Sequence, residues 1–279
     1  MIAGEVCITP HERKIKDWAD YGIRGKIHYG RPIVAEPYRR VIGLRVSKAL
    51  ATLCEFFETI GDASYVAVSF GVDSLVACDL ARRLRPAVRA AWVNQGPLAE
   101  WPDCLALKDL MVAEGLSLTE IAPDVTLYDW YRLNGIPYGA NMNNAEDERL
   151  NKALLYEPIN RFHREQGMRG AVWGLRWRGE GNHRAFVIKG NGELYTRKAD
   201  GITVCSPVGN WTKAEIWAYI DLHGLPYPAF YDIDREKIRN GPPIGVTGLH
   251  MGRLVRFRQL FPEMWRVFCM EFEEIQRYG

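Results

Sequence analysis

The sequence predicts an α/β fold, a doubly wound parallel sheet of the Rossmann-like kind. Short apolar runs rich in β-branched residues alternate along the chain with segments whose apolar residues recur at helical spacing. One of these runs leads directly into a turn of serine and glycine residues and then into a helix, as in nucleotide-binding α/β proteins. With 279 residues, of which 47% are apolar, the chain can bury the core of a large domain.

The expected elements follow one another in the order that βαβ units require. The first helix covers 40–60 and ends at Gly61. Strands are expected at 64–69, 88–93, 117–122, 170–175 and 203–207. Helices are expected at 73–85, 101–115, 150–166, 212–223 and 253–277. Asn210 or Thr212 caps the fourth of these, Gly224 ends it, and Pro262 bends the last one. The polar stretch 123–148 is expected to be irregular.

A β-hairpin is predicted at 185–199, where the alternation of strands and helices is interrupted. Two short apolar runs, 186–189 and 193–196, flank Gly190-Asn191-Gly192. Two extended runs separated by glycine and asparagine are typical of a tight hairpin turn.

Three segments are expected along the chain: a loop-rich basic arm at 1–40, a nucleotide-binding α/β domain at 41–245, and a helical segment at 246–279 packed on it. Residues 1–48 hold ten Lys or Arg against five Asp or Glu, so they carry +5 while the remainder carries −3. Such an arm could contact nucleic acid or a protein complex. A solvated leader is the interpretation that we favour for it.

Composition and cysteine spacing indicate the environment in which the protein is expected to occur. No run of 18 apolar residues and no signal peptide is visible, so we expect no membrane contact. The six cysteines include no Cys-x-x-Cys pair, so we expect no iron–sulfur cluster. A reduced, cytoplasmic chain fits this cysteine pattern best, and an oligomer is left open.

The segment 69–74, Ser-Phe-Gly-Val-Asp-Ser, carries the expected chemistry. Backbone N–H groups at a helix start attract anions, and Gly71 allows close approach of a phosphate. Ser69 and Ser74 can donate their hydroxyls to phosphate oxygens. A carboxylate repels phosphate, so Asp73 is expected to hold the turn or to help bind Mg²⁺. The alternative is an ordinary strand–helix turn with a capping residue.

This segment resembles the PP-loop, Ser-Gly-Gly-x-Asp-Ser, of the ATP pyrophosphatase and adenine nucleotide α-hydrolase superfamily. Phe70 replaces the first glycine of that pattern and Val72 stands at its variable position. The resemblance implies that residues 69–74 bind an adenine nucleotide. We expect Phe70 to narrow the loop or to stack near the ligand.

Two later segments resemble the phosphoadenosine phosphosulfate (PAPS) reductase family. Gly174-Leu175-Arg176, followed by Glu180 and Arg184, is similar to that family's Gly-x-Arg element. Residues 206–227 resemble its conserved Trp-Thr and Gly-Leu-Pro-Tyr stretch. The resemblance implies that Gly174, Arg176, Glu180 and Arg184 contact the nucleotide. It also implies that Asp73, Arg176 and Arg184 are the catalytic residues.

This sequence departs from the family pattern at positions that the family's activity depends on. Val246–His250 is the nearest match to the family's Glu-Cys-Gly-Leu-His, so Thr247 stands where a catalytic cysteine is expected. His250 would face the phosphates or be structural, and Cys269 is more consistent with the core. Asn94 stands where relatives have Asp, in the region expected to recognise the base or ribose.

The function expected from the sequence is binding of ATP or a related adenine nucleotide, with Mg²⁺, and cleavage or adenylation through the α–β phosphate bond. Hydrolysis of that bond would release AMP and pyrophosphate. One alternative is a PAPS or APS reductase that uses a non-standard thiol. Another is a non-catalytic nucleotide-binding subunit of a complex that handles nucleic acid.

Overall fold

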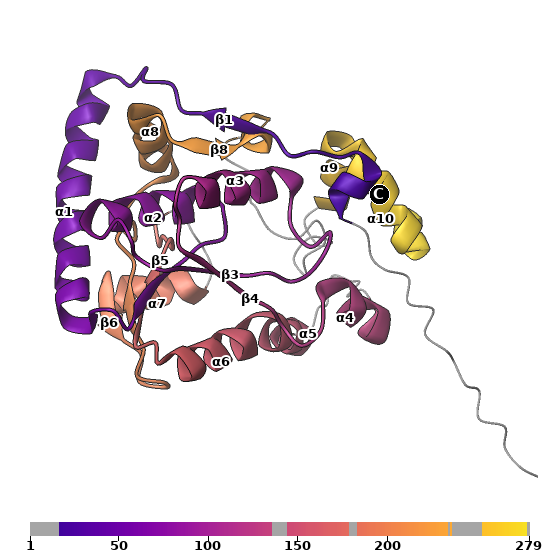
Figure 1. The fold of residues 1–279 in the computed structure, drawn as a ribbon. Coiled ribbons are helices and arrows are strands. Elements are labelled where there is room, and N and C mark those ends of the chain that lie inside the picture. The colour runs from indigo at the N-terminus through magenta and orange to yellow at the C-terminus, as the bar shows by residue number, and fades with distance from the viewer. Residues whose placement is uncertain (1–16, 136–143, 179–182, 234, 236–252, 278–279) are drawn as a thin grey trace, which may run out of the picture.

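A six-stranded sheet forms the centre of the computed structural model, which describes residues 17–135, 144–178, 183–233, 235 and 253–277 (Figure 1). The strand order is β4-β3-β2-β5-β7-β6. The bounds are β2 Ser64–Ala67, β3 Ala90–Val93, β4 Leu118–Ile121, β5 Gly170–Trp173, β6 Leu194–Thr196 and β7 Thr203–Cys205. All neighbours pair in parallel except β6, which is antiparallel to β7. The predicted α/β fold with a mostly parallel sheet is therefore confirmed.

Helices cover both faces of this sheet (Figure 1). One layer contains α1 Glu36–Ile60, α2 Val72–Leu84, α3 Pro102–Ala113 and α8 Lys213–His223. On the other face, α5 Asn144–Asn151 continues through a π-helical turn, Lys152–Tyr156, into α6 Glu157–Gln166. Thr212 caps α8 by accepting a hydrogen bond from the Glu215 N–H, and Gly224 ends the helix in the left-handed conformation. No described helix combines the length and the apolar run that crossing a bilayer requires.

The predicted hairpin at 185–199 is wrong, because its first half is helix α7, His183–Asn191. Gly192, at φ +89°, ends this helix, and its N–H donates to the Ile188 carbonyl at 2.9 Å. The Asn191 amide donates to the Val187 carbonyl at 2.8 Å, so the Gly-Asn-Gly run terminates a helix. Ile188 is buried, and burying it stabilises the helix over the extended form. The hairpin of this region is formed instead by β6 and β7.

Two further expectations differ from the structure. Residues 123–148 are not wholly irregular, because Thr126 caps α4, Leu127–Asn134, whose first turns bury aromatic side chains. The closing segment is not one helix but α9 Arg253–Leu260, α10 Pro262–Glu271 and a 3₁₀ turn Glu273–Arg277. Pro262 starts α10 because a proline has no N–H to continue the preceding helix.

The described part of the N-terminal arm is packed on the α/β body. After a 3₁₀ turn, Trp18–Tyr21, strand β1 (Ile27–Tyr29) pairs antiparallel with β8 (Pro226–Pro228). Trp18 is buried and its indole N–H donates to the Glu100 carbonyl at 2.7 Å. A Cβ on Gly25 would lie 2.0 Å from the Pro102 carbonyl oxygen, so this backbone lies directly against α3.

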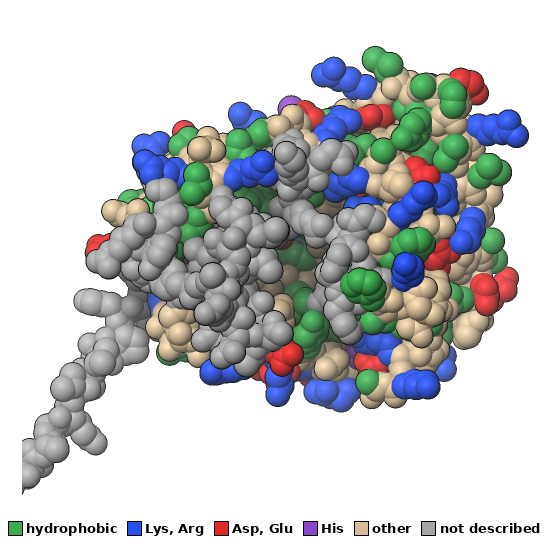
Figure 2. Space-filling model, turned by 180° about the vertical axis from the view of Figure 1, so that it is seen from behind, with side chains coloured by type: hydrophobic (Ala, Val, Ile, Leu, Met, Phe, Trp, Pro, Cys, Tyr) green, Lys and Arg blue, Asp and Glu red, His purple; other side chains and the backbone are tan. Residues whose placement is uncertain are grey.

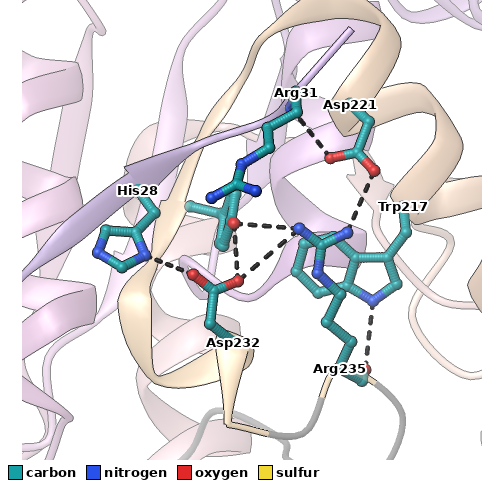
Figure 3. Close-up of polar contacts among 7 residues, drawn as sticks. His28, Arg31, Trp217, Asp221, Asp232 and Arg235 are labelled. Atoms are coloured by element: carbon teal, nitrogen blue, oxygen red, sulfur yellow. Dashed lines mark hydrogen bonds and ion pairs between the residues drawn. The ribbon is translucent and has the colours of Figure 1, made fainter. Parts of the chain in front are cut away.

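Asp232 holds the arm to the body through a polar cluster (Figure 3). Its carboxylate contacts His28 from β1 and accepts from the Tyr227 hydroxyl at 2.8 Å. Arg235 lies 3.7 Å from the same carboxylate, pairs with Asp221 at 3.1 Å, and stacks over an α8 tryptophan. Burial opposes ionisation of Asp232, but these hydrogen bonds outweigh it and lower its pKa.

We expect Asp232→Asn to lower the free energy of unfolding at pH 7 by about 1 kcal/mol, because one carboxylate serves several partners at a half-exposed site. Because the pKa of Asp232 is lower in the folded state, its carboxylate stabilises the folded protein above the pKa of the unfolded state, roughly 3.9. This contribution is lost as the pH falls. When the free energy of unfolding of both proteins is measured by urea denaturation and plotted against pH, the two plots should therefore converge below about pH 4. Asp109→Asn, an exposed carboxylate paired with Lys108, is the control. A gap that stays constant with pH would contradict this role for Asp232.

Candidate functional site

A cavity of ≈620 Å³ opens at the carboxyl ends of the central strands and extends along one face of the sheet. The strands contribute residues mainly of one face, and the π-helical turn, α6 and α7 close the opposite side. Its lining includes Tyr65, Ala67, Ser69, Ser74, Ala91, Val93, Glu100, Ile121, Tyr156, Ile159, Trp173, Gly174, Tyr195 and Arg197. Apolar and aromatic side chains predominate, which is typical of a small-molecule site.

Small residues on β2 and β3 create the room for this cavity. Ala67 and Ala91 both line it and are paired with each other across the two strands. Larger side chains at these positions would fill the space between the sheet and α6. Tyr65 lies two residues before Ala67, so both project from the same face of β2.

The loop 69–74 lies at the mouth of the cavity, between β2 and α2. Gly71 is the N-cap of α2, with φ −81° and ψ 155°. The Ser74 hydroxyl lies 2.9 Å from the Gly71 carbonyl and accepts from the Ser69 N–H at 3.2 Å. The hydroxyls of Ser69 and Ser74 are 3.2 Å apart, and both residues line the cavity. The first N–H groups of α2 have no partner within the helix and point out of its N-terminus, where the helix dipole is positive. The mouth of the cavity is therefore suited to an anion.

Phe70 directs its ring into the protein core and not into the cavity. It has φ +55°, a left-handed conformation that costs a non-glycine residue energy, and it stands where the PP-loop pattern has glycine. Its ring is buried and packs edge-on against Trp92 at 5.7 Å. Burial of this ring offsets the backbone cost. Any ligand contact at Phe70 is therefore left to its backbone.

Position 174, at the end of β5, must be glycine because it lies directly against the backbone of α2. A Cβ at this position would lie 2.4 Å from the Cα of Ser74 and 2.5 Å from its nitrogen. No real Cβ tolerates such distances, so the strand end and the helix start lie in backbone contact. The Gly-x-Arg element thus borders the loop and the cavity together.

Arg176 lies beside Asp73, beneath the loop. Its Nε is 3.0 Å from an Asp73 carboxylate oxygen, and its side chain is 4% exposed against 25% for Asp73. Neither atom meets the angular requirement of a hydrogen bond, so charge attraction holds the pair. Arg176 also donates to the Arg178 carbonyl at 3.1 Å. The sequence placed Arg176 on the ligand's phosphates, and that role stays a prediction; its observed neighbour is the loop carboxylate.

The other predicted site residues are distributed as follows. Asn94 accepts from the Gly96 N–H at 3.0 Å and donates to Glu120 at 3.0 Å, so its side chain stabilises its own turn. Arg184 belongs to the first turn of α7, but its side chain lies outside the described part of the chain. Glu180, Thr247 and His250 lie outside the described residues altogether.

The sequence reading missed the residues on the inner wall of the cavity. Tyr65, from β2, shares a 2.9 Å hydrogen bond with Nε2 of His163 on α6. Burial raises the pKa of Tyr65 and lowers that of His163, so a neutral phenol and a neutral imidazole share this hydrogen bond at pH 7. Arg197 stacks over Trp173 at 5.2 Å and is paired with Asp200. Only the alternation of side chains along β2 could have indicated Tyr65 in advance.

The described residues do not assemble a metal cage of their own. No group of three His, Cys, Asp or Glu side chains in the described ranges could hold a metal ion. Asp73, the residue expected to help bind Mg²⁺, already has Arg176 beside it. This fits a carboxylate that organises the loop better than one that ligates a metal.

Positive charge in the described part of residues 1–48 is partly committed to contacts within the chain. Arg39 donates to the Pro32 and Val34 carbonyls, Arg45 pairs with Glu215 at 3.1 Å, and Lys48 pairs with an acidic side chain at 2.7 Å. Figure 2 shows Lys and Arg side chains scattered among acidic and apolar ones over the face it presents. A nucleic-acid or protein partner at the arm stays a prediction.

Comparison with known proteins identifies relatives of the chain. Residues 63–238 match the family model described as phosphoadenosine phosphosulfate reductase domain. The chain is 26% identical over 196 residues to phosphoadenosine 5'-phosphosulfate reductase of Gloeobacter violaceus, covering 65% of this chain and 71% of the relative. It is 26% identical over 197 residues to adenosine 5'-phosphosulfate reductase of Bacillus mycoides, covering 68% and 76%. The crystal structure of a PAPS reductase from Candida auris has the same fold, with a TM-score of 0.52 at 18% identity, covering 73% of this chain and 94% of that one.

We expect Arg176→Met to lower the free energy of unfolding by about 2–4 kcal/mol, because it leaves the Asp73 carboxylate without its buried partner. The double variant Asp73→Asn/Arg176→Met should recover part of this loss, as urea denaturation would show. Arg83→Met is the matched control, since Arg83 pairs with Asp79 on the surface of the same helix and should cost under about 1 kcal/mol. Equal effects of the two arginine variants would mean that Arg176 is not structural, and would favour a phosphate contact.

Proposed function

Because the chain belongs to the phosphoadenosine phosphosulfate reductase domain family, we propose that it binds an adenine nucleotide in the cavity and acts at the nucleotide's α–β phosphate bond. The observation that carries this proposal is the position of the loop 69–74. It places two serine hydroxyls and the start of α2 at the mouth of an apolar cavity of ≈620 Å³. This size lies within the range of about 300–1,000 Å³ usual for small-molecule sites.

The base belongs in the inner part of the cavity. A flat ring fits over Ala67 and Ala91, where short side chains leave the face of the sheet open. Tyr65, Ile121 and Tyr195 surround that floor with apolar surface and two phenol rings. Aromatic and aliphatic contacts of this kind favour a purine and exclude water from it.

The phosphates belong at the loop. Ser69 and Ser74 offer hydroxyls, and the N-terminal end of α2 offers backbone N–H groups and the positive end of its dipole. Arg176 fixes Asp73, and Asp73 lies in the first turn of that helix. In this proposal the pair keeps the loop in the phosphate-binding shape.

The chemistry proposed is in-line attack at the α-phosphorus, by water or by an acceptor, with pyrophosphate as the leaving group. Water gives AMP, and an acceptor oxygen or sulfur gives its adenylate. Such a reaction asks the protein mainly for positioning and for stabilisation of negative charge. Mg²⁺ bound with the nucleotide would neutralise part of that charge, with the phosphates supplying most of its ligands.

Sulfonucleotide reduction is the second candidate, and the names of the relatives favour it. That reaction needs a thiolate as nucleophile. The five described cysteines are free thiols, yet none is among the residues that line the cavity. Burial raises the pKa of Cys78 to about 12 and also raises that of Cys269 in α10. Cys54, the exposed one, lies on α1. Reduction would therefore depend on Cys7, outside the described residues, or on a thiol from a partner.

We expect Ala67→Leu to reduce the affinity for ATP and AMP at least roughly tenfold, since the added atoms fill the proposed base site. Affinity for pyrophosphate should change little. Ser74→Ala should weaken ATP and pyrophosphate alike by about tenfold, the effect of one hydrogen bond to a charged group. Calorimetry measures all of these.

Ser117→Ala is the control for these titrations, because Ser117 is exposed and precedes β4 at its amino end, whereas the cavity lies at the carboxyl ends of the strands. If both site variants bound ATP as the parent does while keeping their circular dichroism spectra, the cavity would not be the nucleotide site.

Product analysis separates the two reactions. With ATP and Mg²⁺ we expect AMP and pyrophosphate, and not ADP and phosphate. With PAPS and thioredoxin or a small thiol we expect no sulfite. Sulfite release that disappears in Cys7→Ser or Cys269→Ser would establish a reductase instead. Nucleotide binding without any product would indicate an accessory nucleotide-binding subunit.

A further inference from the structure

Glu100 provides negative charge at the mouth of the cavity. Two of the described residues that line the cavity are charged, Glu100 and Arg197. Arg197 is paired with Asp200 and follows β6, the antiparallel strand, so it lies near the end at which the parallel strands begin. Glu100 lies in the loop between β3 and α3, at the opposite end. A carboxylate therefore lies at the same end of the cavity as the loop 69–74, where the phosphates are proposed to bind.

The loop that holds Glu100 adjoins the loop 69–74. The strands that precede the two loops, β3 and β2, are parallel neighbours, so both loops leave the sheet at one edge. Cys104, in the first turn of α3, connects them, because its Sγ lies 4.0 Å from the Phe70 carbonyl oxygen. Burial raises the pKa of this thiol, and the charge of Glu100 and a hydrogen bond to it raise the pKa further. The carboxylate and the loop 69–74 thus share one buried neighbour.

The carboxylate of Glu100 is fixed in its position. The backbone carbonyl of Glu100 accepts from the Trp18 indole N–H at 2.7 Å, and its carboxylate accepts from the Trp101 N–H at 2.9 Å. Two residues earlier, Leu98 has φ +61°, a left-handed conformation, but its side chain is buried and its carbonyl accepts from the Tyr128 hydroxyl at 3.3 Å. The positive end of α3 favours a negative charge at this point. Glu100 therefore offers a charged oxygen on a backbone that is held from both sides.

A carboxylate and a chain of phosphates at one cavity mouth repel each other unless a cation lies between them. Nucleoside triphosphates bring Mg²⁺ with them, and proteins usually bind that ion through one or two carboxylates together with the phosphates of the substrate. We propose that Glu100 is the carboxylate that binds the Mg²⁺ of the bound nucleotide. This inference rests on the proposed function, because the phosphates supply most of the other ligands.

Asp73, the residue that the sequence assigned to Mg²⁺, is less suited to it. One oxygen of Asp73 lies 3.0 Å from Nε of Arg176. A guanidinium at this distance neutralises the carboxylate and repels a divalent cation. The Glu100 carboxylate accepts from the backbone N–H of Trp101, a neutral donor that does not cancel its charge. The two acidic residues therefore have different tasks: Asp73 shapes the loop, and Glu100 meets the cation.

Calorimetric titration with ATP, in EDTA and in excess Mg²⁺, tests this role. We expect Mg²⁺ to raise the affinity of the parent for ATP at least about tenfold, and Glu100→Gln to remove most of that gain. In EDTA the variant should bind ATP roughly threefold more tightly than the parent or better, because a repulsive charge is gone. Glutamine keeps an oxygen that can accept from the Trp101 N–H, so thermal unfolding should change little. Glu114→Gln, an exposed carboxylate at the far end of α3, is the matched control and should behave as the parent.

Manganese measures the metal itself, independently of any reaction. With Mn²⁺ and a non-hydrolysable ATP analogue, electron paramagnetic resonance should show Mn²⁺ bound about tenfold more weakly in Glu100→Gln than in the parent, and Glu100→Asp should recover part of the affinity. If Mg²⁺ raised the affinity for ATP equally in the parent and in Glu100→Gln, the role of Glu100 would be wrong while the nucleotide site stood. A parent that bound no ATP in either condition would contradict the proposed function, and this inference with it.

Discussion

The start of α2 and the end of β5 approach so closely that only glycine fits at the strand end. A Cβ on Gly174 would lie 2.4 Å from the Cα of Ser74, so the backbone after β5 lies directly against the backbone of the first turn of α2. This contact sets where the first turn of α2 lies relative to the sheet, and with it the direction of the Ser69 and Ser74 hydroxyls. The ion pair of Asp73 with the largely buried Arg176 joins the same two elements a second time. The site depends on this double attachment of a loop to its neighbouring strand.

In the same loop, the energetic cost of an unfavourable backbone conformation is offset by the packing of a side chain in the core. Phe70 adopts a left-handed conformation that glycine would adopt freely, yet its ring is buried against Trp92. Core burial thus holds the turn in a shape that the backbone alone disfavours. The same chain places the large ring of Phe70 in the core and keeps alanines at positions 67 and 91, where larger side chains would close the cavity. The sizes of the side chains at positions 67, 70 and 91 therefore determine both the stability of the loop and the room for a ligand.

Membership of the PAPS reductase family and the geometry of the site agree on an adenine nucleotide as the proposed ligand, and they leave the reaction to the residues around it. The described thiols are either buried in the core or displayed on α1, away from the cavity lining. If the cavity holds the proposed nucleotide, a lining in which the described residues include no thiol suits a reaction at phosphorus better than one at sulfur. Strand β1 of the arm is held through Asp232, pairs with β8 and contacts α3, so it contributes to stability more directly than to this site.

Sequence by itself determined the parallel sheet, the positions of its central strands, the loop 69–74 and the end of α8, and it limited the cap of α8 to Asn210 or Thr212, because each depends on periodicity or on residues adjacent in the chain. It could not determine that Gly-Asn-Gly at 190–192 ends a helix, because the choice between turn and helix end rests on burial of Ile188 by distant segments. Nor could it assign Arg176 to Asp73 or bring Tyr65 and His163 together, 98 residues apart. Those partners meet only when strands and helices pack, and the tertiary structure alone decides which side chains then share a cavity or a charge.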